Sequence, residues 1–288
     1  MLSIIGLVVL IVMVFGGFAI TGGSLGPVLH ALPHEFLIIG GAAAGATLVA
    51  TDIKGIKEMG GGLGKVVKGP KYKKADYGAA IFLTARLMRL FRTEGPTAVE
   101  PHIEDPKSSS IFAEYPQFAA DHFFIDLVTD SIRLLVVSTG TLSPNAVDEV
   151  IETHIDTHHH AALKPVERLQ TMSDALPALG IVAAVLGVIK TMGSIDQPPA
   201  ILGAMVGSAL VGTFLGVLLS YGIVGPLSAR LKAVIDEDSE IYMVVRRVII
   251  ATLKGQPQPL VIEAARTSIS PTHQPSFSEI FDGMRTAK

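Results

Sequence analysis

Four stretches without a charged side chain constrain this sequence more than any other feature. Asp, Glu, Lys and Arg are all absent from Met1–His34, Phe36–Thr51, Ala175–Ile189 and Gln197–Ala229. A helix of about 20 apolar residues is long enough to cross the hydrocarbon core of a bilayer. The pattern predicts four membrane-spanning helices, the first within Met1–Ile20, with no ionisable residue inside any of them. An ion path through these helices would then need a carboxylate from another subunit.

The composition agrees with a protein embedded in a lipid bilayer. Of the 288 residues, 49% are hydrophobic and 17% are charged, and the mean hydropathy is +0.50. The net charge of −3 offers no basic excess for phosphate, so nucleic acid is not an expected partner. The chain has no Cys, which excludes disulfides and thiolate metal sites. The alternative of a cleaved signal peptide is disfavoured, because no basic residue precedes the first apolar run.

The distribution of Lys and Arg predicts the orientation in the membrane. Of 23 basic residues, fourteen lie between Lys54 and Arg168 and eight lie from Arg230 onward, whereas residues 21–33 contain none. Basic residues that flank spans favour the cytoplasmic side. Both large polar segments and both chain termini are therefore expected in the cytoplasm.

The predicted fold is an all-α membrane protein with a large helical cytoplasmic domain between spans two and three. The expected parts are spans one and two (1–52), the cytoplasmic domain (53–173), spans three and four (174–229), and a cytoplasmic helix with its tail (230–288). The last part begins as a helix at about residues 227–254 that extends span four, and from Gly255 it is expected to pack loosely because it is rich in Pro and Ser.

Within the cytoplasmic domain the apolar periodicity is helical. Helices are expected at residues 76–92 with Gly95 and Pro96 as the stop, at residues 116–138 with Gly140 as the stop, and after Ser143, which suits an N-cap. The Gly-rich stretch at residues 60–74 lacks the G-x-x-x-x-G-K-[ST] pattern of a phosphate loop and is expected to be a flexible basic linker.

The motifs give no support for an enzyme, a cofactor or a metal. The string that starts at His34 and Glu35 is not a complete H-E-x-x-H, because Ile38 stands where the second His is needed. His154 and His158 have the i, i+4 spacing of a zinc pair, but no third ligand is indicated. Packing or surface exposure is the favoured interpretation of these histidines, and a metal site is the alternative.

Basic and acidic residues follow one another closely in the cytoplasmic domain. Arg86, Arg89 and Arg92 recur every three residues near a helix end, and an acidic segment at residues 100–105 follows, broken by Pro101. Taken alone, this pattern indicates a solvated face with local ion pairs.

Four strings carry a resemblance to a known family. The string DALPALGIVAAVLGVIKTMGSIDQPPAILGAMVGSALVGTFLGVLLSYGIVGPL at residues 174–227 closely resembles the third and fourth spans of the MotA family of flagellar stator proteins, within the MotA/TolQ/ExbB proton channel family. VFGGFAITGGSLG (14–26), RTEGPTAVEPHIEDPKSSSIFAEYP (92–116) and PSFSEIF (275–281) are also similar to this family. The resemblance covers nearly the whole chain.

The resemblance implies a stator subunit in the bacterial inner membrane, at the flagellar basal body, that serves flagellum-dependent motility and chemotaxis. Members work with MotB, a single-span protein whose membrane aspartate carries the proton. A homopentamer is thought to surround two MotB chains and to turn the rotor protein FliG as protons enter the cell.

The resemblance also implies roles for individual residues. Arg92 and Glu100 occupy rotor-facing positions, and Pro177 and Pro226 match two functional prolines. Residues Ala184, Thr213 and Tyr221 match positions that line the subunit interface near the partner aspartate. Sodium-driven relatives have Thr where this chain has Ala184, so protons are the expected driving ion.

Two alternative functions remain open from the sequence. ExbB- or TolQ-like proteins energise outer-membrane systems with similar third and fourth spans, but they generally have three spans and lack the segment from Arg92 to Glu100. A membrane scaffold that does not conduct ions would need neither a partner carboxylate nor a rotor.

Overall fold

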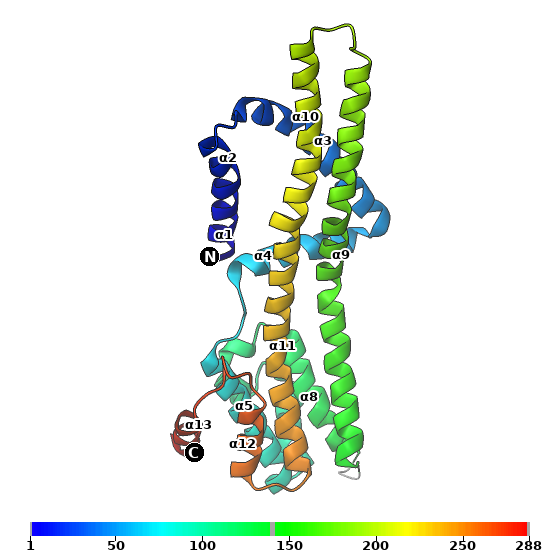
Figure 1. Ribbon diagram of the computed structural model, residues 1–288. Helices are drawn as coiled ribbons and strands as arrows, with labels where there is room; N and C mark the ends of the chain where they lie inside the picture. The colour runs from blue at the N-terminus through cyan, green and yellow to red at the C-terminus, as the bar shows by residue number, and fades with distance from the viewer. Residues whose placement is uncertain (1, 139–141, 287–288) are drawn as a thin grey trace. The chain divides into compact units, whose positions relative to one another are not determined.

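The structure is a computed structural model that describes residues 2–138 and 142–286. Every regular element in these residues is a helix (Figure 1). The elements are α1 (Leu2–Ile11), η1 (Val12–Gly16), α2 (Gly17–Ile20), α3 (Leu25–Ala50), α4 (Ile53–Lys68), α5 (Lys74–Glu94), α6 (Pro96–Glu104), α7 (Ser110–Ala113), η2 (Pro116–Phe118), α8 (His122–Val137), α9 (Pro144–Met192), α10 (Pro199–Val217), η3 (Leu218–Val224), α11 (Gly225–Leu253), α12 (Gln258–Thr267) and α13 (Phe277–Thr286). The all-α prediction is confirmed for the described residues, and the predicted stop at Gly140 lies outside them.

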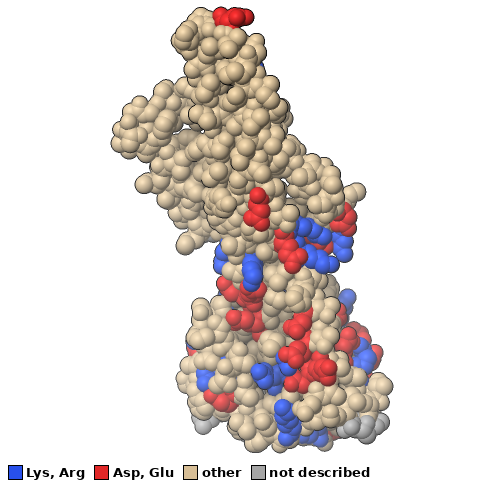
Figure 2. Space-filling view, turned by 45° about the vertical axis from the view of Figure 1, so that its right-hand side comes forward, with Lys and Arg blue, Asp and Glu red and all other residues tan. Residues whose placement is uncertain are grey.

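The chain forms two compact units. The membrane unit comprises Met1–Gly69 and Ala162–Val234, and the polar unit comprises Pro70–Ala161 and Ile235–Lys288. Within the described residues, four helical stretches are long and apolar enough to cross a membrane, which confirms the predicted number of spans. These stretches are Leu2–Ile20, Leu25–Ala50, Pro144–Met192 and Pro199–Leu253. Figure 2 shows that charged side chains crowd one region of the surface and leave another large region almost bare.

The second span is longer than predicted, and this changes its chemistry. Helix α3 begins at Leu25 rather than at Phe36, so that His30, His34 and Glu35 all lie inside it. The prediction that no span contains an ionisable residue is therefore wrong. A charged residue usually marks the edge of a span, but a helix satisfies its own backbone hydrogen bonds and can continue past one carboxyl group that neighbouring helices cover.

The Gly-rich stretch is also a helix rather than the predicted flexible linker, at least as far as Lys68. The Asp52 carboxylate caps α4 by accepting a hydrogen bond from the Gly55 backbone N–H, at 2.8 Å. Met59, Gly62 and Val66 form its buried face. A Cβ placed on Gly62 would lie 2.7 Å from Leu231 Cδ2, so this glycine admits the leucine side chain. Tertiary packing outweighs the low helix propensity of glycine here.

Spans three and four continue as long helices. The helix predicted to start at Ser143 and the third span form the single helix α9, and the Ser143 hydroxyl accepts from the Ala146 backbone N–H at 3.2 Å, as predicted for an N-cap. Span four comprises α10, the π-helical segment η3 and the start of α11. Helix α11 then runs to Leu253, which confirms the predicted extension.

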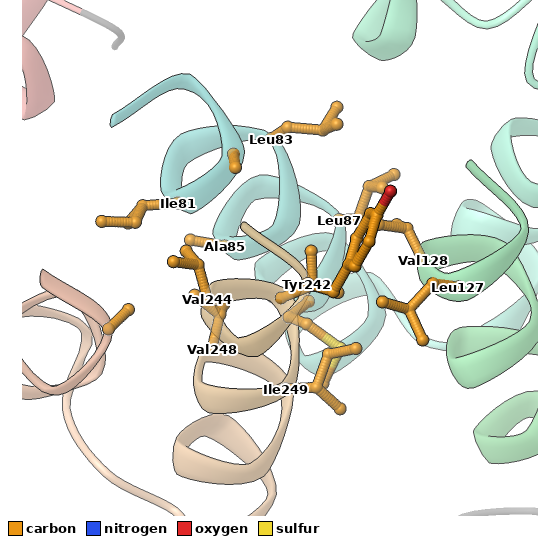
Figure 3. Close-up of a cluster of buried hydrophobic side chains, with 14 of the residues drawn as sticks. Ile81, Leu83, Ala85, Leu87, Leu127, Val128, Tyr242, Val244, Val248 and Ile249 are labelled. Atoms are coloured by element: carbon orange, nitrogen blue, oxygen red, sulfur yellow. The ribbon is translucent and has the colours of Figure 1, made fainter. Parts of the chain in front are cut away.

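The polar unit has its own hydrophobic core. Figure 3 shows Ile81 and Leu87 of α5, Leu127 of α8 and Val248 of α11 converging on it, and all four side chains are fully buried. The core is bordered by the buried carboxylate of Asp121, which caps α8 through the Phe124 backbone N–H, so α8 starts later than predicted. Burial raises the pKa of Asp121, but hydrogen bonds led by the one from the Tyr72 hydroxyl outweigh that effect and lower it below its usual value.

Helix α6 occupies the acidic segment that the prolines were expected to break. Gly95 has a φ of +88° and separates α5 from α6, which confirms the predicted stop. Pro96 stands in the first turn of α6, where its missing N–H costs nothing. Pro101 lies inside the helix, and burial of Val99 and Ile103 in the core of the polar unit offsets its cost.

The C-terminal segment is ordered, contrary to the prediction of a loosely packed tail. Ile280 of α13 is buried, and a Cβ on Gly78 of α5 would lie 3.3 Å from its Cδ1. Ser276 and Glu279 form a reciprocal cap: the Ser276 N–H donates to the Glu279 carboxylate at 2.6 Å, and the Glu279 N–H donates to the Ser276 hydroxyl at 3.2 Å. The hydrogen bond from Lys74 is the main reason that the pKa of Glu279 falls to about 2.

Candidate functional site

Helices α9 and α10 approach each other closely along a seam of glycines. A Cβ on Gly180 would lie 2.8 Å from the Gly212 carbonyl oxygen, and a Cβ on Gly216 would lie 2.7 Å from the Leu176 carbonyl oxygen. Any larger residue at these positions would push the two backbones apart. Small residues at a helix interface permit this close packing.

The two predicted prolines lie beside one buried contact. Pro177 is in the interior of α9, and because it has no N–H it leaves the carbonyl of Ser173, four residues earlier, without its helical donor. The buried Ser173 hydroxyl donates to the Ser220 carbonyl oxygen at 3.1 Å. Ser220 belongs to the π-helical segment η3, which ends just before Pro226. An irregular turn of span four is thus hydrogen-bonded to the turn that Pro177 loosens in span three.

Ala184, Thr213 and Tyr221 have different environments within the membrane unit. The Ala184 backbone nitrogen would be 3.3 Å from a Cβ on Gly212, so Ala184 and Thr213 lie at the same level of adjacent helices. Both side chains are half-buried, whereas the side chain of Tyr221 is 71% exposed. Tyr221 continues an exposed apolar stripe at residues 210, 214 and 217. The i, i+4, i+7 spacing places this stripe on one helix face.

Glu35 is a candidate site residue that the sequence analysis missed. Its side chain is 6% exposed, and its Oε2 atom has no hydrogen-bond partner among the described residues. A Cβ on Gly212 would lie only 2.6 Å from this oxygen. The signal was present in the sequence, since Glu35 is a lone carboxylate between two charge-free stretches, and one span could include the end of the first stretch and the whole of the second.

Arg92 and Glu100 lie on either side of the turn at Gly95 and are both exposed. Arg92, in the last turn of α5, donates from Nη1 to the Gln256 carbonyl oxygen at 3.3 Å. Glu100 of α6 forms no side-chain hydrogen bond or ion pair with any residue that the structure describes. Two residues of the predicted solvated face form ion pairs within the polar unit: Arg86 lies 2.6 Å from Glu114, and Glu104 lies 2.7 Å from Arg133.

An open cleft of about 760 Å³ adjoins this surface in the polar unit. Its walls come from α5, α6, α7 and α12, and Arg89, Glu94 and His102 line it alongside apolar side chains. The ion-pair interpretation therefore holds for Arg86 and Glu104, while Arg92 and Glu100 keep charges that other molecules can reach.

The two histidines with zinc-like spacing pack on an aromatic ring. The His158 ring stacks on Phe123 with centroids 3.6 Å apart, and the His154 ring meets the same ring edge-on at 5.0 Å. The described residues contain no group of three His, Cys, Asp or Glu side chains placed to hold a metal ion.

Comparison with known proteins gives consistent matches over the chain. Residues 4–95 match the family model described as Motility protein A N-terminal, and residues 120–243 match that of the MotA/TolQ/ExbB proton channel family. Motility protein A of Escherichia coli (strain K12) is 38% identical over 288 residues, covering 100% of this chain and 96% of the relative. Chemotaxis protein LafT of Vibrio parahaemolyticus is 35% identical over 280 residues, covering 97% of each.

Two solved structures share the fold. The structure of C. jejuni MotAB gives a TM-score of 0.73 at 20% identity, with 93% of this chain and 95% of that chain covered. The MotAB stator complex from Bacillus subtilis gives a TM-score of 0.70 at 20% identity, with 99% and 98% covered.

Proposed function

The chain belongs to the MotA family of flagellar stator proteins, within the MotA/TolQ/ExbB proton channel family, and we propose that it is the subunit that turns inward proton flow into torque on a flagellar rotor. The observation that carries this proposal is the 38% identity to Motility protein A along the full chain, which includes the spans and the polar unit alike. No enzymatic activity, metal or cofactor is part of the proposal.

The proposed partners follow from the family. A single-span MotB chain would supply a membrane aspartate, and several copies of this chain, five around two MotB, would surround it. The exposed apolar stripe that ends at Tyr221 suits contact with such neighbours or with lipid. Ala184, Thr213 and Tyr221 would line the ion path at this contact.

We also propose that the two units have different roles. The membrane unit would carry the ion path and the coupling prolines Pro177 and Pro226, and the polar unit would lie in the cytoplasm, as would both chain termini. The protein would be a multi-pass component of the inner membrane at the flagellar basal body. Arg92 and Glu100 would contact the rotor protein FliG, and their accessible charges support this role.

An ExbB- or TolQ-like role has less support. Residues 4–95 match the Motility protein A N-terminal family, and the exposed pair Arg92 and Glu100 lies at or beyond the end of that match. An outer-membrane energiser has no evident use for this rotor-facing segment.

Deletion of the gene tests the proposed function. We expect deleted cells to assemble flagellar filaments but not to swim, and a plasmid copy of the chain to restore swimming. We also expect a single-span protein with a membrane aspartate to co-purify with the tagged chain. Normal swimming after deletion, or an outer-membrane transport defect in swimming cells, would contradict the stator proposal.

A separate prediction concerns the driving ion. Ala184 places a methyl group where a hydroxyl would help to replace the hydration shell of Na⁺, so protons are expected to drive the motor. Swimming speed should persist when sodium in the medium is replaced by potassium and should fall to zero with a protonophore. Cells that stop on sodium removal yet tolerate the protonophore would show that sodium is the driving ion.

A further inference from the structure

We propose that Glu35 is a proton-binding site within this chain's own spans, and that its protonated form packs α3 against α10 beside Thr213 and Ala184. The inference rests on the proposed stator function for its consequences in the cell, but the binding site itself is argued from the geometry of the membrane unit. It adds a titrating group to a path whose only expected carboxylate belonged to the partner.

The carboxyl group of Glu35 is buried, and one of its oxygens has no hydrogen-bond partner in the part of the chain that the structure describes. The Glu35 side chain is 6% exposed, and its Oε2 atom accepts no hydrogen bond from the described residues. Burial of an ionised carboxylate here raises the free energy by several kcal/mol, because no hydrogen bond replaces those that the group made to water. The neutral carboxylic acid removes most of this cost.

The surroundings leave space for the carboxyl group. A Cβ on Gly212 would lie 2.6 Å from Glu35 Oε2, so a larger residue at position 212 would displace this oxygen. The same imagined Cβ would be 3.2 Å from the Ala183 Cβ and 3.3 Å from the Ala184 backbone nitrogen. The carboxyl group therefore lies close to where α3, α9 and α10 meet.

The other titratable groups near Glu35 lie on its own helix. On α3 itself, His34 is adjacent to Glu35 and His30 lies one turn earlier, with the two imidazole rings 6.3 Å apart and both exposed. The facing part of α9, between Asp174 and Lys190, and the whole of α10 contain no charged residue or histidine. Two exposed imidazoles, His30 and His34, therefore precede one buried carboxyl group on the same helix.

These features define a simple protonation step. A proton binds a carboxylate oxygen of Glu35 and forms an O–H bond, and its release restores the carboxylate without any other bond changing. The charged form requires water or a cation at the junction with α10, so that loss of the proton favours separation of α3 from Gly212. Because Thr213 follows Gly212, this change would reach the proposed ion path directly.

Infrared spectroscopy of the purified full-length chain tests the site without reference to motility. At neutral pH we expect a carboxylic acid C=O band in the wild type that is absent from Glu35→Gln and present in the matched control Asp196→Asn. Asp196 is an exposed acid between α9 and α10 and loses the same charge. A wild-type spectrum without this band, or a band that survives in Glu35→Gln, would overturn the proposal.

Complementation of the deleted strain tests the consequence. Glu35→Gln keeps the neutral shape but cannot release a proton, so we expect normal membrane levels and a severalfold loss of swimming speed. Glu35→Asp should keep more speed than Glu35→Gln, and Asp196→Asn should match wild type. If Glu35→Gln swims like wild type, Glu35 is not a functional proton site. If the wild-type chain itself does not restore swimming, the stator proposal fails, and the infrared result still decides the site.

Discussion

Cells that carry Arg92→Glu are expected to be nearly unable to swim, although the protein inserts and associates with MotB normally. Glu100→Lys is expected to act alike. Exposed charges contribute only about 0–1 kcal/mol to folding, so their reversal leaves the polar unit intact. At a transient contact with a rotor, the same charges set orientation and encounter rate, and reversal turns attraction into repulsion. We expect at least a tenfold loss of swimming speed.

The fold supplies a matched control for this experiment. Glu104 is on the same helix as Glu100 and is similarly exposed, but it pairs with Arg133 within the polar unit. Glu104→Lys should therefore cost little stability and leave swimming close to wild type. A compensating charge reversal on the rotor protein should restore part of the speed to Arg92→Glu or Glu100→Lys. If all three variants swim equally well under viscous load, or if the first two do not accumulate in the membrane, the rotor-contact interpretation is wrong.

Substitution of Pro177 by Ala is expected to give a stator that assembles but does not turn. The alanine has a backbone N–H that can donate to the Ser173 carbonyl, which lacks its helical donor when residue 177 is proline. A proline inside a helix destabilises that helix by about 3 kcal/mol or more relative to alanine. A bias of this size shifts an equilibrium between straight and bent helix by more than about a hundredfold. If bending of α9 couples protonation to movement of the polar unit, the variant is locked in the straight form.

A second proline in the same helix provides the control. Pro165 is also inside α9 and is buried, but it lies three turns before Pro177, away from the Ser173 contact with η3. We expect Pro165→Ala to swim normally and Ser173→Ala, which removes only the hydrogen bond to Ser220, to swim slowly. Membrane levels and co-purification with MotB should be unchanged in all three variants. Loss of assembly in Pro177→Ala would show that this proline supports the fold rather than a movement.

The sequence by itself determined the class of the protein and the number of its spans. A charged side chain is costly at membrane depth, so the charge-free runs indicated four spans, although the second one extends past the run that predicted it. The N-cap at Ser143 and the helix stop at Gly95 could also be predicted from the sequence, because helix ends depend on residues that are close together in the chain. The strings around Pro177 and Arg92 were specific enough to indicate the family.

Only the tertiary structure decided which exceptions to these local rules are stable. Glu35 lies inside a span because Gly212, from a helix far along the chain, leaves space for its carboxyl group. The Gly-rich helix α4 and the tail helix α13 form because their apolar faces pack against Leu231 and Gly78, which no local pattern connects to them. Likewise, Glu104 and Glu100 look alike in the sequence, and only the approach of Arg133 pairs one and leaves the other available. Such contacts join residues distant in the sequence, and their free energy exceeds the local preferences that they override.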